Sequence, residues 1–384
     1  MDSKKYNNIK LAVGIGKGFA SFILILLFVV SGLSSELQNY VAGIFSSTYL
    51  QFISFVAVTG VAAGIIFFPV NYYTEFYLEH KYNLSNQTFL KWIWEDVKSL
   101  LVSLVIGVPI LLLFFYSLNK FQQLWWLPFA IILFIISVLL ARIVPIFILP
   151  LFYKISPLED EELKSRIQKL ATEAGIKVEN VFKFNMSKNT KKANAAFTGI
   201  GKSKRILLGD TLLENYSSDE IETVIAHELG HYKRKHIIKN IFIGTASSFL
   251  MLYLIAVLYN LSLNWFGFIS IVQIAALPLL SLWAMIIGLV LSPLSNMLSR
   301  KFEYEADEYA VLSTDKKAAF ISTLEKLTDQ NLGDKDPHPF VEWFFYSHPS
   351  IKKRVDAINK FSSRMTSEAH PAGEKLNLSH SDQF

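Results

Sequence analysis

Long apolar stretches separated by short polar segments fill the first part of the chain and return after its middle. Six of them are long enough to cross the hydrocarbon core of a bilayer, which takes about 20 helical residues. They cover residues 11–33, 49–69, 99–117, 124–149, 240–260 and 265–293. The pattern predicts a multi-span α-helical membrane protein, with polar regions at 150–239 and after 299.

The polar region at 150–239 changes periodicity along its length. Residues 158–174 place apolar side chains at helical spacing and stop at Gly175. Three short runs have the composition of strands: 181–185, 194–198 and 205–208. The turn-rich residues 199–203 between the last two runs suit a hairpin loop. This region is therefore predicted to be a small α+β unit.

A capping-box pattern, Ser217 with Glu220 three residues later, opens a further helix. Its apolar spacing continues through residues 227–231, and we predict that it runs without a break into the fifth span. After the sixth span, residues 299–312, 316–328 and 349–361 have helical periodicity.

These patterns divide the chain into five predicted parts. They are a four-span membrane region (1–149), an α+β unit (150–239), two further spans (240–298), a helical region (299–361) and a flexible tail (362–384).

Composition agrees with a membrane class and excludes several functions. Only 18% of residues are charged, and the mean hydropathy is +0.35. The absence of cysteine removes disulfides, thiolate metal ligands and a cysteine nucleophile. The net charge of +5 is mild, and no basic stripe with interleaved aromatic residues appears, so no nucleic-acid partner is expected.

Orientation follows from lysine and arginine in the loops, which accumulate on the cytoplasmic side. The N-terminal tail has Lys4, Lys5 and Lys10, and the loop after the second span has Lys81 and Lys91. By contrast, residues 34–48 and 261–264 contain no lysine or arginine. We therefore predict a multi-pass protein with both termini and both polar regions in the cytoplasm. A bacterial inner membrane and the endoplasmic reticulum fit equally well.

The strongest chemical signal is His227-Glu-Leu-Gly-His231. Residues four apart on a helix share a face, so both imidazoles can bind one cation, for which Zn²⁺ is the natural choice. Glu228 is rotated by about 100° from His227, which lets its carboxylate reach an attacking water without binding the metal. Two solvated surface histidines are the alternative, but the cap and apolar positions upstream disfavour it.

The third ligand must come from elsewhere in the chain. On a continuous helix His236 would lie about 180° from His227 and face away. A third histidine six residues after His231 is excluded too, because position 237 is Ile. A downstream carboxylate remains.

Glu303 and Asp307 supply such a carboxylate pair, four residues apart on one predicted helix face. One could bind the metal while the other orients a ligating imidazole. A solvated acidic helix face is the ordinary alternative. Two spans separate the pair from the histidines, however, so both would return to the same side of the membrane.

With these residues in hand, the chain resembles the type I CAAX prenyl proteases, integral-membrane zinc endopeptidases of the gluzincin (zincin) type. The resemblance is carried by residues 78–88, 193–195, 204–208, 227–231, 302–307 and 347–349. The sequence departs from the eukaryotic members by having four predicted spans rather than five before the α+β unit, which leaves a closed chamber of helices in question.

The resemblance implies a role for each candidate residue. His227, His231 and Glu303 would bind one zinc ion, Glu228 would be the general base, and Asp307 would have a supporting catalytic role. These roles imply a peptide or protein substrate, prenylated at its C-terminus in this family, beside membrane lipid.

The resemblance further implies that Asn194 lies on an edge strand that binds the substrate backbone. His348 and Arg354 would donate hydrogen bonds to the developing oxyanion. Among three His-Pro pairs, only that at His348 has an arginine six residues later. Without the resemblance, His348 would be assigned as a structural or surface histidine.

Two other functions stay open at this stage. One is a membrane-protein quality-control protease with no lipid requirement. The other is an inert membrane scaffold that keeps a vestigial metal site, which would predict the loss of a catalytic group.

Overall fold

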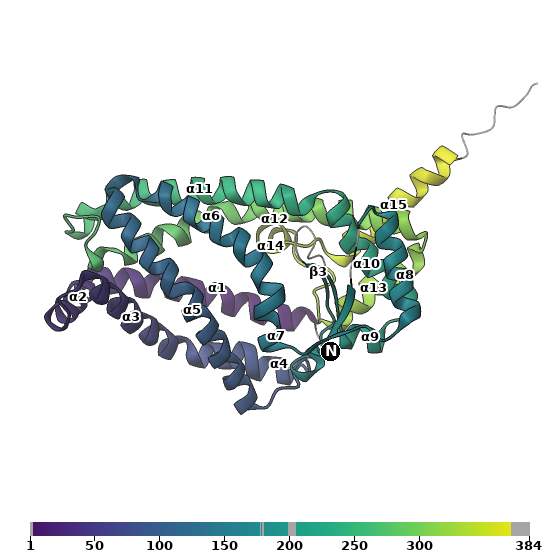
Figure 1. The fold of residues 1–384 in the computed structure, drawn as a ribbon, viewed down its shortest axis with the longest axis horizontal. Helices are drawn as coiled ribbons and strands as arrows, with labels where there is room; N and C mark the ends of the chain where they lie inside the picture. The colour runs from purple at the N-terminus through teal and green to yellow at the C-terminus, as the bar shows by residue number, and fades with distance from the viewer. Residues whose placement is uncertain (1–2, 177, 179, 199–204, 370–384) are drawn as a thin grey trace, which may run out of the picture.

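A computed structural model describes residues 3–176, 178, 180–198 and 205–369, and the protein is elongated and mostly helical (Figure 1). Long helices run along most of its length, and a mixed unit of short strands and helices lies at one end (Figure 1). The apolar stretches thus form the long helical part of the molecule, and much of the polar sequence forms the mixed unit at its end.

The membrane part is built from long helices with short connections. They are α1 (Ser3–Val30), α2 (Leu33–Ile44), α3 (Thr48–Asn71), α4 (Leu78–Lys81), α5 (Phe89–Phe121), α6 (Trp126–Ile143), α7 (Leu149–Phe152), α11 (His236–Ser262) and α12 (Pro278–Thr314). Two π-helical turns, at Tyr72–Tyr77 and Val144–Ile148, join α3 to α4 and α6 to α7. Short 3₁₀ turns occur at Gln122–Leu124, Leu263–Phe266 and Ile274–Ala276.

Within the described residues, six helical segments are long and apolar enough to cross a membrane, which confirms the predicted number, although the sixth begins at Ile274 rather than at residue 265. Many of their apolar side chains face outward, such as Ile65 and Val105, as expected where lipid rather than protein covers a helix. Other side chains hold the bundle together, and the rings of Phe52 and Phe115 stack at a centroid distance of 4.4 Å.

The loop between the first two spans contains α2, a helix that the sequence analysis did not predict. This helix has 12 residues, so it is only about 18 Å long, too short to cross a hydrocarbon core of about 30 Å. It therefore adds a helix to the first part of the chain without adding a span.

The mixed unit contains one four-stranded sheet in the order β1-β2-β4-β3. Its strands are β1 (Ile155–Pro157), β2 (Asn180–Phe184), β3 (Ala195–Thr198) and β4 (Arg205–Gly209). Its helices are α8 (Glu161–Glu173), α9 (Asp210–Asn215), α10 (Ser218–Lys233), α13 (Lys317–Gln330), α14 (Pro339–Phe345) and α15 (Ile351–Ala369), with a 3₁₀ turn at Met186–Lys188. The α+β prediction is confirmed, although β1, α9 and α14 were not anticipated.

The strand pairing leaves β3 at an edge. β2 and β4 are parallel, while β3 pairs with β4 antiparallel, with Ala195 opposite Leu208. The predicted hairpin loop at 199–203 lies outside the described residues. Among the described residues, one long edge of β3 is therefore not paired with another strand of the sheet.

Close packing of α10 against α12 brings the two candidate ligand motifs together. A Cβ atom added at Gly230 would lie 3.1 Å from the Cα atom and the carbonyl oxygen of Ala306. A side chain at this position would force the backbone of α12 to give by a few tenths of an ångström, and Ala306 and Leu229 are fully buried beside it. The absence of a side chain at position 230 thus lets the carboxylate helix approach the histidine helix.

Two helix boundaries differ from prediction. The helix that carries the histidines ends at Lys233, and Lys235 has a φ of 58° in the left-handed region before α11 begins at His236. The prediction of one unbroken helix into the fifth span was therefore wrong. By contrast, the sixth span and the helix predicted at 299–312 form one continuous helix, α12, which runs through Asp307 to Thr314.

Candidate active site

Three side chains converge where α10 and α12 meet. Nε2 of His227 lies 3.2 Å from Nε2 of His231. Oε2 of Glu303 lies 3.5 Å from His227 Nε2, and Oε1 of Glu303 lies 3.4 Å from His231 Nε2. The structure thus brings together the three residues that the sequence nominated as a ligand set, with one carboxylate oxygen of Glu303 near each imidazole, and we call these three residues the ligand triangle.

The size of this triangle fits a metal ion. Zinc bound tetrahedrally at 2.0–2.1 Å requires ligand atoms about 3.3 to 3.4 Å apart. Glu303 is 5% exposed, and its Oε2 atom makes no well-formed hydrogen bond. A buried carboxylate oxygen of this kind is costly unless a cation or donor satisfies it. The described donor set therefore suits a divalent cation.

The ion pair of Asp307 and Arg354 lies next to the Nδ1 side of the His227 ring. Nδ1 of His227 lies 2.9 Å from Oδ1 of Asp307, which is fully buried. Asp307 in turn accepts hydrogen bonds from Nε and Nη2 of Arg354, at 2.8 and 2.5 Å. This arrangement fixes the ring of His227 with Nε2 toward the cleft, as expected of an outer carboxylate behind a ligating imidazole.

The pKa values here follow from the same contacts. Burial lowers the pKa of His227, but the hydrogen bond and charge of Asp307 outweigh it, so the pKa is raised. Burial also lowers the pKa of Arg354, and the Asp307 carboxylate reverses that effect and raises it. The guanidinium is therefore a permanent cation at the back of the site.

His231 has a similar contact with His236, which the sequence analysis did not predict. Nδ1 of His231 lies 3.0 Å from Nδ1 of His236, and Nε2 of His236 lies 2.9 Å from Oε2 of Glu305. His236 is buried and stacks on Phe302 at a centroid distance of 4.2 Å. The interruption of the helix at Lys235 turns His236 back toward His231. The inference that His236 faces away was therefore wrong.

The ligand triangle opens onto a cleft of about 290 Å³. Glu228 lines this cleft together with Ala193, Asn194 and Ala195 at the start of β3. The edge strand therefore lies across the same cleft as His227 and Glu228.

His348 and Arg354 have different surroundings. The side chain of His348 is 65% exposed, and its Nδ1 atom lies 3.0 Å from Oε2 of Glu303. Arg354 is only 13% exposed, and its observed partner is Asp307, with Glu303 Oε2 at 3.7 Å. His348 can thus turn toward a substrate, whereas Arg354 is held against the carboxylate pair.

A membrane fold in which a His-Glu-x-x-His helix meets a downstream glutamate defines a zincin-type membrane metallopeptidase. Two family matches give the same result. Residues 157–362 match peptidase family M48, and residues 1–154 match the CAAX prenyl protease N-terminal region, described as five membrane helices. The chain therefore belongs to the CAAX prenyl protease family of membrane metalloendopeptidases.

Individual relatives cover most of the chain. It is 34% identical to CAAX prenyl protease 1 of Saccharomyces cerevisiae over 83% of the chain and 74% of that protein. It is 32% identical to the uncharacterized metalloprotease YhfN of Bacillus subtilis over 93% of the chain and 85% of that protein.

A solved structure agrees with the fold. The crystal structure of S. mikatae Ste24p matches with a TM-score of 0.84 at 29% identity, covering 93% of this chain and 88% of that chain. Four of the candidate spans and the short α2 fall within residues 1–154, where the family description counts five membrane helices.

Proposed function

We propose that this protein is a zinc endopeptidase that cleaves C-terminal peptides of prenylated proteins at the cytoplasmic surface of a membrane. The observation that carries the proposal is the convergence of His227, His231 and Glu303 beside the open edge of β3, with the two Nε2 atoms 3.2 Å apart and a Glu303 oxygen 3.4 to 3.5 Å from each. The names of the yeast and other relatives supply the CAAX substrate class.

Zinc is favoured by the chemistry of the donors. Two imidazoles and one carboxylate, with a further position open to the cleft, are a typical catalytic zinc set. When bound, zinc acts as a Lewis acid that polarises a carbonyl group and acidifies water. The outer partners Asp307 and His236 would hold the two imidazoles with Nε2 free to bind it.

The remaining steps use side chains that line the cleft. Glu228 would accept a proton from the attacking water and pass it to the leaving amine. Asn194 and β3 would hold the substrate backbone by strand addition. His348, exposed and beside Glu303, would donate to the carbonyl oxygen as negative charge develops on it. Arg354 would act indirectly, by keeping Asp307 charged and in place.

The test is proteolysis with controlled metal content. The purified protein, stripped with a chelator, should lose cleavage of a farnesylated C-terminal peptide and regain it with about one equivalent of zinc. Cleavage that survives complete metal removal would contradict a metallopeptidase. Equal rates on farnesylated and unlipidated peptides would instead favour the quality-control function, which needs no lipid.

A further inference from the structure

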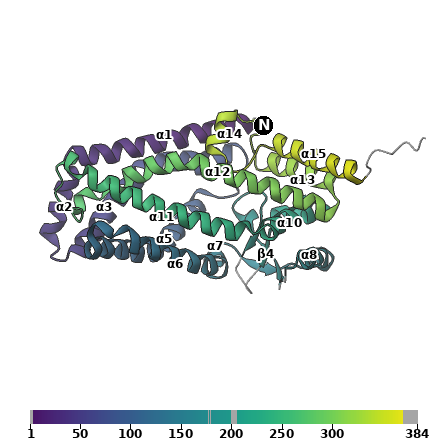
Figure 2. The ribbon, with the colours of Figure 1, turned by 90° about the horizontal axis from the view of Figure 1, so that it is seen from above.

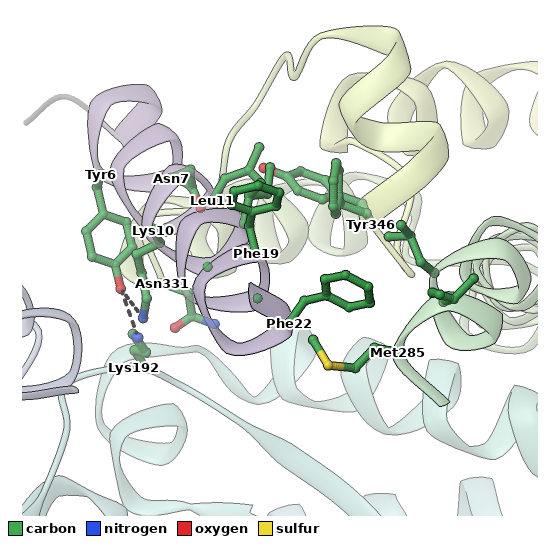
Figure 3. Close-up of a pocket in the computed structure, with 16 residues that line it drawn as sticks. Tyr6, Asn7, Lys10, Leu11, Phe19, Phe22, Lys192, Met285, Asn331 and Tyr346 are labelled. Carbon is green, nitrogen blue, oxygen red and sulfur yellow. Dashed lines mark hydrogen bonds between the residues drawn. The ribbon is translucent and has the colours of Figure 1, made fainter. Parts of the chain in front are cut away.

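A large cavity lies between α1 and α12, outside the ligand triangle. Its volume is about 1070 Å³. Figure 3 shows the residues that line it. From Tyr6 to Phe22 it follows α1 for about 24 Å, and Met285 and Leu289 of α12 line its opposite side. Figure 2 shows the two helices running side by side along the membrane part. The cavity therefore extends from the catalytic unit into the membrane region.

The two ends of this cavity differ in polarity. Tyr6, Lys10, Lys192 and Asn331 gather at one end, where the Tyr6 hydroxyl lies within hydrogen-bond distance of both lysines (Figure 3). Glu79 lies 2.7 Å from Lys10 and 2.9 Å from Lys192 and balances part of their charge. Aromatic and aliphatic side chains, Phe19, Phe22, Met285 and Leu289 among them, form the other end. An occupant with a polar head and a long apolar chain matches this division.

Asn331 connects the polar end to the catalytic cleft. It lines both the α1–α12 cavity and the cleft that contains His227 and Glu228. Its backbone is fixed at the end of α13, where Leu332 adopts a φ of 52° and accepts a hydrogen bond from Asn7 of α1 at 2.6 Å. A non-glycine residue with this φ is strained and persists only where its surroundings hold it.

The side chain of Asn331 also closes one end of the edge strand. The backbone carbonyl of Asn194 accepts from Gly209 of β4, so the alternation along a strand directs the backbone groups of Ala193, Ala195 and Phe197 away from β4. Oδ1 of Asn331 accepts from Ala193 N–H at 2.9 Å, and its Nδ2 donates to the Ala193 carbonyl at 3.2 Å. A substrate strand can therefore pair beside Ala195 but must leave the edge at Ala193.

We propose that the α1–α12 cavity binds the isoprenoid chain of the substrate, and that Asn331 marks the point where the peptide leaves β3 and its lipid enters the cavity. The inference rests on the proposed function, because it takes a prenylated peptide as the substrate. It assigns the lipid a site of its own, separate from the ligand triangle.

Two glycines on α1 make the cavity easy to alter. Gly14 and Gly18 both line it, and a Cβ atom added at either position meets no atom within 4 Å. Gly18→Leu should therefore fill the cavity without forcing α1 from its neighbours. Gly16 is equally open but is rotated by about 200° from both, so Gly16→Leu is a matched control on the other side of the helix.

The measurement is the ratio of kcat/KM for a farnesylated peptide to kcat/KM for the same peptide without lipid. We expect Gly18→Leu to lower this ratio by about tenfold or more, the usual effect of a small volume change in an apolar pocket. Gly16→Leu should keep the wild-type ratio. An unchanged ratio in Gly18→Leu, as expected if a bilayer lipid fills the cavity, would overturn the inference, and so would an equal fall in Gly16→Leu.

The rates of the wild type and of Gly18→Leu separate this inference from the proposed function. If the wild type prefers the farnesylated peptide and Gly18→Leu keeps that preference, the lipid site is wrong while the proposed function stands. If the wild type cleaves neither peptide, the proposed function fails and the lipid site fails with it.

A second measurement does not depend on the folding of a variant. A peptide carrying a photoreactive farnesyl analogue, bound to the wild type and irradiated, should label residues 11–22 of α1, residues 285–289 of α12 or Phe345 at the end of α14. Labelling confined to other helices would overturn the site.

Discussion

The Nδ1 atoms of His231 and His236 face each other at 3.0 Å, so one ring must donate and the other accept. Glu305 decides the direction, because a carboxylate only accepts and therefore fixes the proton of His236 on Nε2. Nδ1 of His236 must then accept from Nδ1–H of His231, which leaves His231 Nε2 unprotonated toward the triangle. A neutral histidine and a distant carboxylate thus define the tautomer of a proposed ligand.

His236→Ala is expected to weaken zinc binding by about ten- to a hundredfold, since it removes the acceptor that holds His231. Competition with a chelator of known affinity measures this directly. Glu305→Ala should act in the same direction, whereas Glu308→Ala on the same helix, whose partner is the surface residue Arg234, should not. Wild-type zinc affinity in His236→Ala would show that the contact has no role at the metal site.

His348 is exposed and contributes little packing, so His348→Ala should fold normally and retain zinc. If it donates to the oxyanion, kcat per zinc-loaded protein should fall about a hundredfold with little change in KM. His338→Ala, at another His-Pro pair, is the control, because that side chain accepts from Phe340 N–H at the start of α14. A kcat close to wild type would remove His348 from the catalytic residues.

At the scale of the elements, the junction between α10 and α11 decides where His236 points. Lys235 there has a φ of 58°, a conformation that glycine adopts freely and a β-branched residue resists. Lys235→Gly should keep or slightly raise the melting temperature, while Lys235→Val should lower it and weaken zinc binding. The comparison is made by thermal unfolding in detergent and by chelator competition. Similar melting temperatures for both variants would show that this backbone conformation is not required.

This junction also shows what the sequence can and cannot predict. The spans, α8 and the capping box at Ser217 follow from local periodicity and side-chain pattern, and the structure contains them. The break at Lys235 has no glycine or proline to mark it, so a continuous helix was the natural assumption and His236 was placed on the wrong face. Periodicity describes elements well but not the angles between them.

The candidate site, too, was predictable from the sequence only in part. The four-residue spacings of His227 with His231 and of Glu303 with Asp307 set each pair on one helix face, which sequence alone predicts. The contact between the two pairs depends on the close approach at Gly230, a tertiary feature. The contacts of Asn331 with Ala193 join segments 138 residues apart, and no local sequence pattern predicts them.

At the scale of the whole molecule, the membrane orientation is a prediction from loop charges. A reporter inserted near Lys188, or fused after Phe384, should have cytoplasmic activity, and one inserted within 34–48 should lie on the opposite side. The three positions serve as controls for one another. Two candidate spans separate Lys188 from the C-terminus, so these two reporters should agree, and three separate it from 34–48, so that reporter should differ. An external signal at Lys188 would contradict the proposed cytoplasmic active site.

In the proposed mechanism, proteolysis depends on a single proton acceptor, Glu228, next to the ligand triangle. Glu228 lines the cleft but is not one of the three residues that form the triangle, so replacing it should separate catalysis from metal binding. Glu228→Gln preserves the shape of the side chain and removes its ability to take a proton. His227→Ala is the complementary variant, because it should lose zinc and activity together.

The most direct test of the account is the cleavage rate of purified Glu228→Gln, measured together with its zinc content. The account predicts about one zinc per chain, as in the wild type, and a cleavage rate lower by about a hundredfold to ten-thousandfold. Wild-type cleavage by a zinc-loaded, contaminant-free Glu228→Gln protein would contradict it.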